Sequence, residues 1–171
     1  MNLLINFGST DVKNYTIKIL KILSDIKFFG KIIIIITSKS NNYRTLVSSI
    51  KNFENLNISL AIDKNQKQLS NIYNKCLLCI GSGGNSLFER LASNLYSIVI
   101  PSNKLEEKSI NYNLYSESVL FIKNLNTLNV LKLNNILMKV LKKSTLDILG
   151  HQQRIFDDKG IERIERIIFD L

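Results

Sequence analysis

Three glycines and three polar side chains stand together where a short apolar run gives way to a helix-like pattern. Residues 81–86 read Gly-Ser-Gly-Gly-Asn-Ser. Glycines in a strand-to-helix loop permit positive φ and let the backbone approach a ligand, and the unpaired N–H groups of a helix start favour an anion. Such a turn can also exist only for tight packing, but the added side-chain donors favour phosphate binding. The candidate phosphate-binding residues are Ser82, Gly83, Gly84, Asn85 and Ser86.

The spacing of this loop differs from those of the common nucleotide motifs. The sixth position of a Gly-x-Gly-x-x-Gly pattern is occupied by Ser86, and no Gly-Lys-[Ser/Thr] follows as in a P-loop. Neither a nicotinamide cofactor nor ATP is indicated, and we expect no cofactor.

Glu89 follows the loop by one helical turn and is predicted to share a helix face with Asn85 and Ser86. A carboxylate at that position is suited to accept hydrogen bonds from the two hydroxyls of a ribose. The alternative is a surface carboxylate paired with Arg90 or a lysine, and spacing alone favours that alternative.

A second loop with similar chemistry lies near the N-terminus, where Gly8, Ser9, Thr10 and Asp11 follow a short apolar run. Its glycine and hydroxyls could bind phosphate, or Thr10 or Asp11 could be an ordinary helix N-cap. The residues support the two readings about equally.

The elements that must position both loops alternate along the chain. Apolar runs predict strands at 3–7, 32–37, 58–62, 76–80, 97–100 and 119–122. Helical spacing predicts helices at 15–26, 43–50, 69–73, 85–94 and 106–117, with a mostly helical remainder. Unbroken apolar strands alternating with helices indicate a doubly wound, Rossmann-like α/β fold, with a parallel sheet of about six strands and helices on both faces. Ligands bind such sheets beyond the carboxyl ends of the strands.

Composition limits the classes of protein. The chain has 171 residues, of which 45% are hydrophobic, and this size indicates one domain spanning residues 1–171. No apolar run approaches the ~20 residues of a membrane-spanning helix, so we expect a soluble, cytoplasmic protein. The formal charge of +9 raises the possibility of a nucleic-acid partner, but the lysines are dispersed, which favours a solvated basic surface over specific nucleic-acid binding.

The residues that most often bind metals or catalyse reactions are sparse. Cys76 and Cys79 stand in an apolar run, where strand periodicity would place them on opposite faces, so we expect buried, reduced thiols and no metal site. The single histidine, His151, lies in the helical C-terminal segment away from any glycine-rich turn and is interpreted as a surface or packing residue. No catalytic residue is assigned.

Residues 81–90, Gly-Ser-Gly-Gly-Asn-Ser-Leu-Phe-Glu-Arg, resemble the signature of the UDP-sugar hydrolase of pseudaminic acid biosynthesis and its spore-coat-polysaccharide relatives. That family is in turn similar to the C-terminal domain of GT-B glycosyltransferases of the MurG type. Residues 6–14 resemble the opening of this domain and residues 157–164 its close, so the resemblance covers nearly the whole chain.

The resemblance implies a role for each matching position. Gly83, Gly84, Asn85 and Ser86 would hold the diphosphate of a UDP-sugar and Glu89 would bind its ribose. The backbone around Ile62 would face the uracil. Gly8, Ser9 and Thr10 would close on the phosphates.

The resemblance also implies a missing part. Enzymes of this kind have two such domains, and the hydrolase takes its catalytic histidine from a Gly-x-Gly-His-x-x-Arg loop of the N-terminal half, which this sequence lacks. We therefore expect a UDP-sugar-binding half that needs an N-terminal domain, in the same or a partner chain, and is inactive by itself. After Pro101 the family has an Asn-Gln pair that contacts the sugar, where this chain has Leu-Glu-Glu-Lys at 105–108. The alternative is a non-catalytic or degenerate binding module on the same scaffold.

Overall fold

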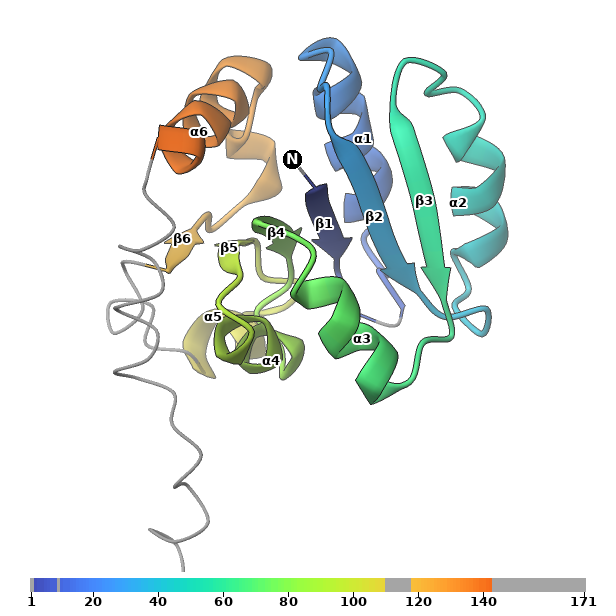
Figure 1. Ribbon diagram of the computed structural model, residues 1–171, viewed down its shortest axis with the longest axis vertical. Helices are drawn as coiled ribbons and strands as arrows, with labels where there is room; N and C mark the ends of the chain where they lie inside the picture. The colour runs from blue at the N-terminus through green and yellow to red at the C-terminus, as the bar shows by residue number, and fades with distance from the viewer. Residues whose placement is uncertain (1, 9, 110–117, 143–171) are drawn as a thin grey trace, which may run out of the picture.

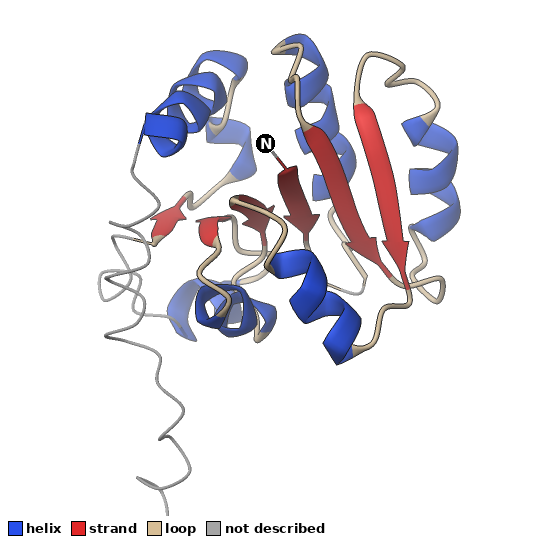
Figure 2. Cartoon of the chain, in the orientation of Figure 1, coloured by secondary structure: helices blue, strands red, loops and turns tan. Residues whose placement is uncertain are grey.

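The computed structural model describes residues 2–8, 10–109 and 118–142. These residues form a parallel sheet in the order β3-β2-β1-β4-β5-β6, flanked by helices (Figures 1 and 2). The strands are β1 (Asn2–Asn6), β2 (Lys31–Ile36), β3 (Asn57–Ile62), β4 (Leu78–Gly81), β5 (Tyr96–Val99) and β6 (Val119–Phe121). The helices are α1 (Tyr15–Asp25), α2 (Tyr43–Ile50), α3 (Gln66–Tyr73), α4 (Ser86–Ala92), α5 (Lys104–Ser109) and α6 (Val130–Lys142), with a 3-10 turn, η2, at Leu125–Thr127.

The central strands are apolar on both faces because helices cover both. Leu3 and Ile5 of β1 pack in the cluster that contains the buried residues of α1, α2 and α6, whereas Leu4 packs on the opposite side beside α3. Leu87 and Leu91 of α4 form a third cluster with β5 and β6. This two-sided burial explains the unbroken apolar runs, and it confirms the predicted doubly wound α/β fold.

The prediction for the two cysteines is partly wrong. β4 begins at Leu78, so Cys76 lies in the turn before it and is not subject to strand alternation. Both thiols are buried and free, and both pack in the cluster with Leu4, Tyr73 and Leu95, on one face of the sheet. Burial raises the pKa of Cys76 to about 12 and also raises that of Cys79. No group of three potential metal ligands occurs in the described ranges.

The later elements are confirmed only in part. The helix predicted at 106–117 begins at Lys104 and is described as far as Ser109; the rest of it, His151 and the 157–164 motif lie outside the described residues. α6 agrees with the expected helical C-terminal region. None of the described helices combines the length and apolarity needed to cross a bilayer.

β1 and β4 lie side by side in the centre of the sheet, and the chain proceeds in opposite directions from them, through β2 and β3 on one side and β5 and β6 on the other. This is the topological switch point, where loops at the carboxyl ends diverge and leave an opening. Asn6 pairs with Gly81 at this edge, and the Ser82 N–H donates to the Asn6 carbonyl at 3.0 Å. Both glycine-rich loops therefore leave the sheet at the same place.

Candidate functional site

Two cavities lie at the carboxyl edge of the sheet and share Gly8 and Ser86 in their walls. The first, of about 500 Å³, extends from the end of β1 to α3 and α4 and includes Asn6, Thr37, Asp63, Tyr73 and Glu89. The second, of about 480 Å³, extends toward α5 and includes Thr10, Ser82, Gly84, Asn85, Ser102, Asn103 and Glu106. Gly8 and Ser86, which line both cavities, mark the place where the two cavities meet at the switch point.

The first loop combines a turn glycine with a helix cap. Gly8 has a φ of 81°, in the left-handed region, and its N–H donates to Asn6 Oδ1 at 3.0 Å. Asp11 is buried and accepts from the backbone N–H groups of Tyr15 (2.9 Å) and Thr16 (3.0 Å) at the start of α1. The N-cap residue itself is Asn14, which makes no side-chain cap bond, so the prediction of Thr10 or Asp11 as an ordinary N-cap is wrong in position. Burial raises the pKa of Asp11. Thr10 lines the second cavity, and Ser9 lies outside the described residues.

None of the glycines at 81–84 has a positive φ, since Gly8 is the glycine with positive φ among the described residues. A Cβ at Gly81 would overlap the backbone oxygen of Asn6, whereas one at Gly84 would meet only Glu106 Oε1, at 3.5 Å. Asn85 makes no side-chain cap bond to α4. The expectation of left-handed glycines in this loop is therefore wrong, and Gly81 is needed for the contact between β4 and β1.

Arg90 lies beneath this loop and is fully buried. Its guanidinium donates to the Ser82 carbonyl at 2.7 Å and to Ser86 Oγ at 3.2 Å, and its Nε has no hydrogen-bond partner among the described residues. Within those residues the only ion pair joins Lys123 and Glu107, so none neutralises this cation by a salt bridge. A buried, unpaired guanidinium gives the loop above it a positive potential.

The sequence indicated Arg90 as the last residue of the family signature and as a possible partner for Glu89, but not as a buried cation beneath the loop. Arg90 follows Ser86 by four residues on the helix after the loop, and this spacing could have predicted the contact between the two side chains.

Glu89 is oriented by a buried tyrosine. It is exposed to the first cavity, where Tyr73 Oη donates to its Oε2 at 3.2 Å. Burial, and next the charge of Glu89, raise the pKa of Tyr73. Ser86 lines this cavity together with Glu89, whereas Asn85 lines the second one.

The far wall of the first cavity forms where β2 and β3 end. Ile62 is the last residue of β3, and Asp63 and Lys64 after it line the cavity. The Asp63 carboxylate accepts from Thr37 Oγ1 at 2.9 Å and from the Ser38 N–H at 3.0 Å, and the bonds from Ser38 lower its pKa. These bonds tie the loops after β2 and β3 together.

Glu106 of α5 contacts the glycine-rich loop directly. Its Oε2 accepts from the Gly83 N–H at 3.2 Å and from the Ser102 N–H at 2.8 Å. In the sequence this position stands out only as part of the departure from the family's Asn-Gln pair, and the contact with Gly83 was not predicted.

Comparisons with known proteins reveal likeness in the fold. No protein-family model and no curated protein matches the chain. The solved structure of MurG from Acinetobacter baumannii matches all of it, with a TM-score of 0.73 and 12% identity, over 52% of that protein. A glycosyltransferase of kitacinnamycin matches 99% of it (TM-score 0.68, 12% identity, 42% of that protein). SnogD, a glycosyltransferase from Streptomyces nogalater, matches 89% (TM-score 0.56, 14% identity, 39% of that protein).

The chain has the fold of one domain of a GT-B glycosyltransferase. It spans about half the length of these structures or less. The likeness supports the expected Rossmann-like domain at the level of fold.

Proposed function

We propose that this domain binds a UDP-sugar and forms the nucleotide-binding half of a GT-B-type hydrolase or glycosyltransferase. The observation that carries the proposal is the pair of cavities that meet at Gly8 and Ser86 over the switch point of the sheet. Their volumes, about 500 and 480 Å³, are each in the range of roughly 300–1,000 Å³ that is usual for small-ligand sites. Two joined compartments suit a ligand with a nucleoside at one end and a sugar at the other.

In this proposal the uridine occupies the first cavity. Glu89, held by Tyr73, accepts hydrogen bonds from the ribose hydroxyls. The uracil lies against the backbone at the end of β3, at Ile62 and Asp63, where the loops after β2 and β3 are tied together.

The diphosphate lies at the junction between the cavities. Gly83, Gly84 and Ser86 provide donors from one loop, and Gly8 and Thr10 close from the other. Ser9 lies in the same loop, and Ser82 and Asn85 line the second cavity, which receives the sugar. The buried charge of Arg90, transmitted through its hydrogen bonds to the loop, favours an anion at this point.

The chemistry expected of the assembled enzyme is attack on the sugar C1 by water or by an acceptor hydroxyl, with UDP as the leaving group. This domain would stabilise the charge that develops on the diphosphate through fixed backbone and side-chain donors. The residue that activates the nucleophile would come from an N-terminal domain. The resemblance of residues 81–90 favours the hydrolase of pseudaminic acid biosynthesis or another enzyme of surface-polysaccharide synthesis.

Calorimetric titration of the purified chain with UDP, UMP, ADP and GDP at moderate salt tests the proposal. Selective binding of UDP is expected, with a Kd of about 1 mM or tighter. Equal weak binding of all four nucleotides through the net charge of +9, or no binding, would favour the alternative of a non-catalytic module.

A further inference from the structure

We infer that Glu106 is an internal competitor of the diphosphate, holding a backbone donor of the glycine-rich loop until the ligand displaces it. The inference rests on the proposed function, because it assigns a second ligand to the same loop. It begins from one contact, the 3.2 Å hydrogen bond from the Gly83 N–H to Glu106 Oε2. A backbone N–H of this kind is what a phosphate oxygen would take, and one N–H cannot serve two acceptors at full strength.

The local structure of α5 explains only part of this arrangement. Asn103 Oδ1 accepts from the Glu106 N–H at 2.8 Å, which is half of a capping box. In a complete box the glutamate would accept from the Asn103 N–H, but Oε2 accepts from Ser102 and, at the same time, from Gly83, which is 23 residues away in sequence. Capping of α5 does not require the hydrogen bond from Gly83. The carboxylate therefore also holds a donor of the glycine-rich loop.

The Glu106 carboxylate and a bound phosphate compete for the Gly83 N–H, and repulsion between their negative charges strengthens this competition. Glu106 lines the second cavity beside Ser82 and Gly84, and its Oε1 lies 3.5 Å from where a Cβ of Gly84 would be. A phosphate bound at Gly83 and Gly84 would lie within a few ångströms of the carboxylate, and like charges at that separation repel strongly near a protein surface. Beneath them, the buried Arg90 attracts whichever anion occupies the loop. The carboxylate therefore satisfies the loop in the empty domain and opposes the diphosphate.

Glu107 provides a matched control on the same helix. Its carboxylate pairs with Lys123 at 3.1 Å, and it is not among the residues that line either cavity. Replacing it by Gln makes the same change in net charge as Glu106→Gln, but it does so away from the loop.

The test is titration of the wild type, Glu106→Gln, Glu106→Ala and Glu107→Gln with inorganic pyrophosphate and, separately, with uridine. Gln can still accept from Gly83 and Ser102 without the charge, and Ala removes the acceptor. Both variants are expected to bind pyrophosphate about tenfold more tightly than the wild type, equivalent to about 1.4 kcal/mol. Uridine affinity should be unchanged, and Glu107→Gln should bind pyrophosphate like the wild type. Circular dichroism melts check that each variant folds.

Unchanged or weaker pyrophosphate binding in both Glu106 variants would overturn the inference, because Glu106 would then only hold the loop in shape. An equal gain in Glu107→Gln would also overturn it, since the effect would be one of net charge. The proposed function is tested separately by the preference of the wild type for UDP over ADP. A gain in pyrophosphate binding without that preference would support the competitor and reject the UDP site.

Discussion

At the scale of single residues, the candidate site depends on charged groups whose neighbours set their roles. Glu89 and Arg90 are adjacent in sequence, yet one is exposed to a cavity beside Tyr73 and the other is buried under Ser82. Adjacency in sequence suggests an ion pair between these side chains, but successive helix positions point in different directions. The two charges consequently act on different parts of the proposed ligand.

Glu89→Gln is expected to weaken UDP binding by about 1 kcal/mol, because the ribose hydroxyls would then donate to a neutral amide oxygen in place of a charged carboxylate. Uridine binding should weaken by a similar factor and pyrophosphate binding should not change. Tyr73→Phe should give a smaller loss of the same kind, since it removes the bond that orients the carboxylate. Titration calorimetry measures all three ligands, with Glu107→Gln as the control. Unchanged uridine affinity in Glu89→Gln would remove Glu89 from the site.

At the scale of elements, the site exists because β4 pairs with β1, so that both strands end at the same place. Gly81 faces the Asn6 carbonyl across the pair, and the two strands deliver the glycine-rich loops to one edge. The glycines of the loop are therefore not equivalent. Gly81 leaves room for the Asn6 carbonyl of β1, whereas Gly84 lines the second cavity.

Gly81→Ala is expected to lower the free energy of unfolding by about 1 to 3 kcal/mol, because the added methyl group must push the backbone of β1 away. Gly84→Ala, whose methyl group would make only ordinary contact with Glu106, should change stability by less than about 0.5 kcal/mol. Urea unfolding followed by circular dichroism compares the two variants. Equal losses would show that the close strand approach does not distinguish these glycines.

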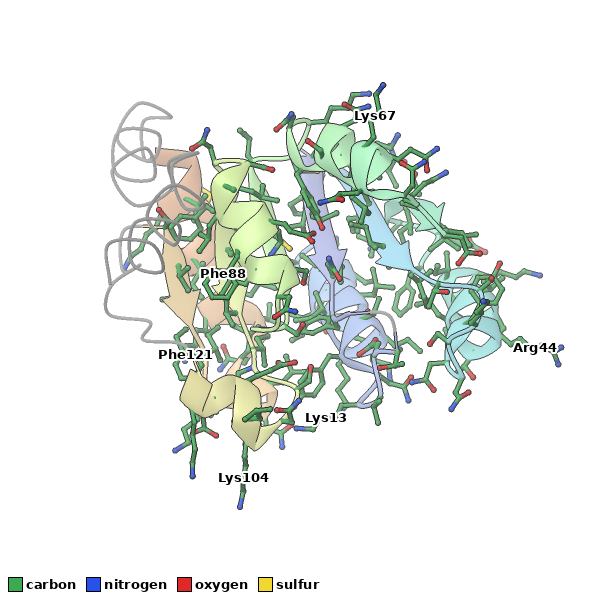
Figure 3. The ribbon with its side chains drawn as sticks, turned by 90° about the horizontal axis from the view of Figure 1, so that it is seen from below. Lys13, Arg44, Lys67, Phe88, Lys104 and Phe121 are labelled. Carbon is green, nitrogen blue, oxygen red and sulfur yellow. The ribbon has the colours of Figure 1, made fainter. Side chains whose placement is uncertain are left out.

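At the scale of the whole molecule, positive charge is spread around the domain. Figure 3 shows Arg44, Lys67 and Lys104 pointing outward from separate parts of the fold. This distribution agrees with the expected solvated basic surface. The buried charge of Arg90 is separate from it and lies under the switch point.

Global stability should fall in alkali because of the buried thiols. Burial raises the pKa of Cys76 from 9.0 to about 12, so the folded protein keeps a proton that the unfolded chain releases. The stability linked to this proton is fully present below about pH 9 and is lost as the pH rises toward 12. Urea unfolding of Cys76→Ala between pH 8 and 10.5 should therefore show a shallower decline than the wild type, by about 1 kcal/mol per pH unit or less. Parallel declines would mean that Cys76 ionises as readily in the folded state as in the unfolded chain.

The sequence by itself determined the elements of this protein, and the tertiary structure decided how they meet. Isoleucine runs such as 32–36 and the helical spacing after Tyr15 are local patterns, and local patterns identify buried strands and helices. The glycines in the sequence likewise predicted that both loops follow strands. They did not predict that Gly81 contacts Asn6.

The contacts that define the site join residues far apart in the chain. Glu106 reaches Gly83 across 23 residues and Tyr73 reaches Glu89 across 16, and Cys76 joins the cluster of Cys79 only because β4 begins after it. Such pairings depend on the order of strands and on which helix covers which face. No periodicity encodes them, because periodicity reports the surroundings of one element and not the identity of its neighbours.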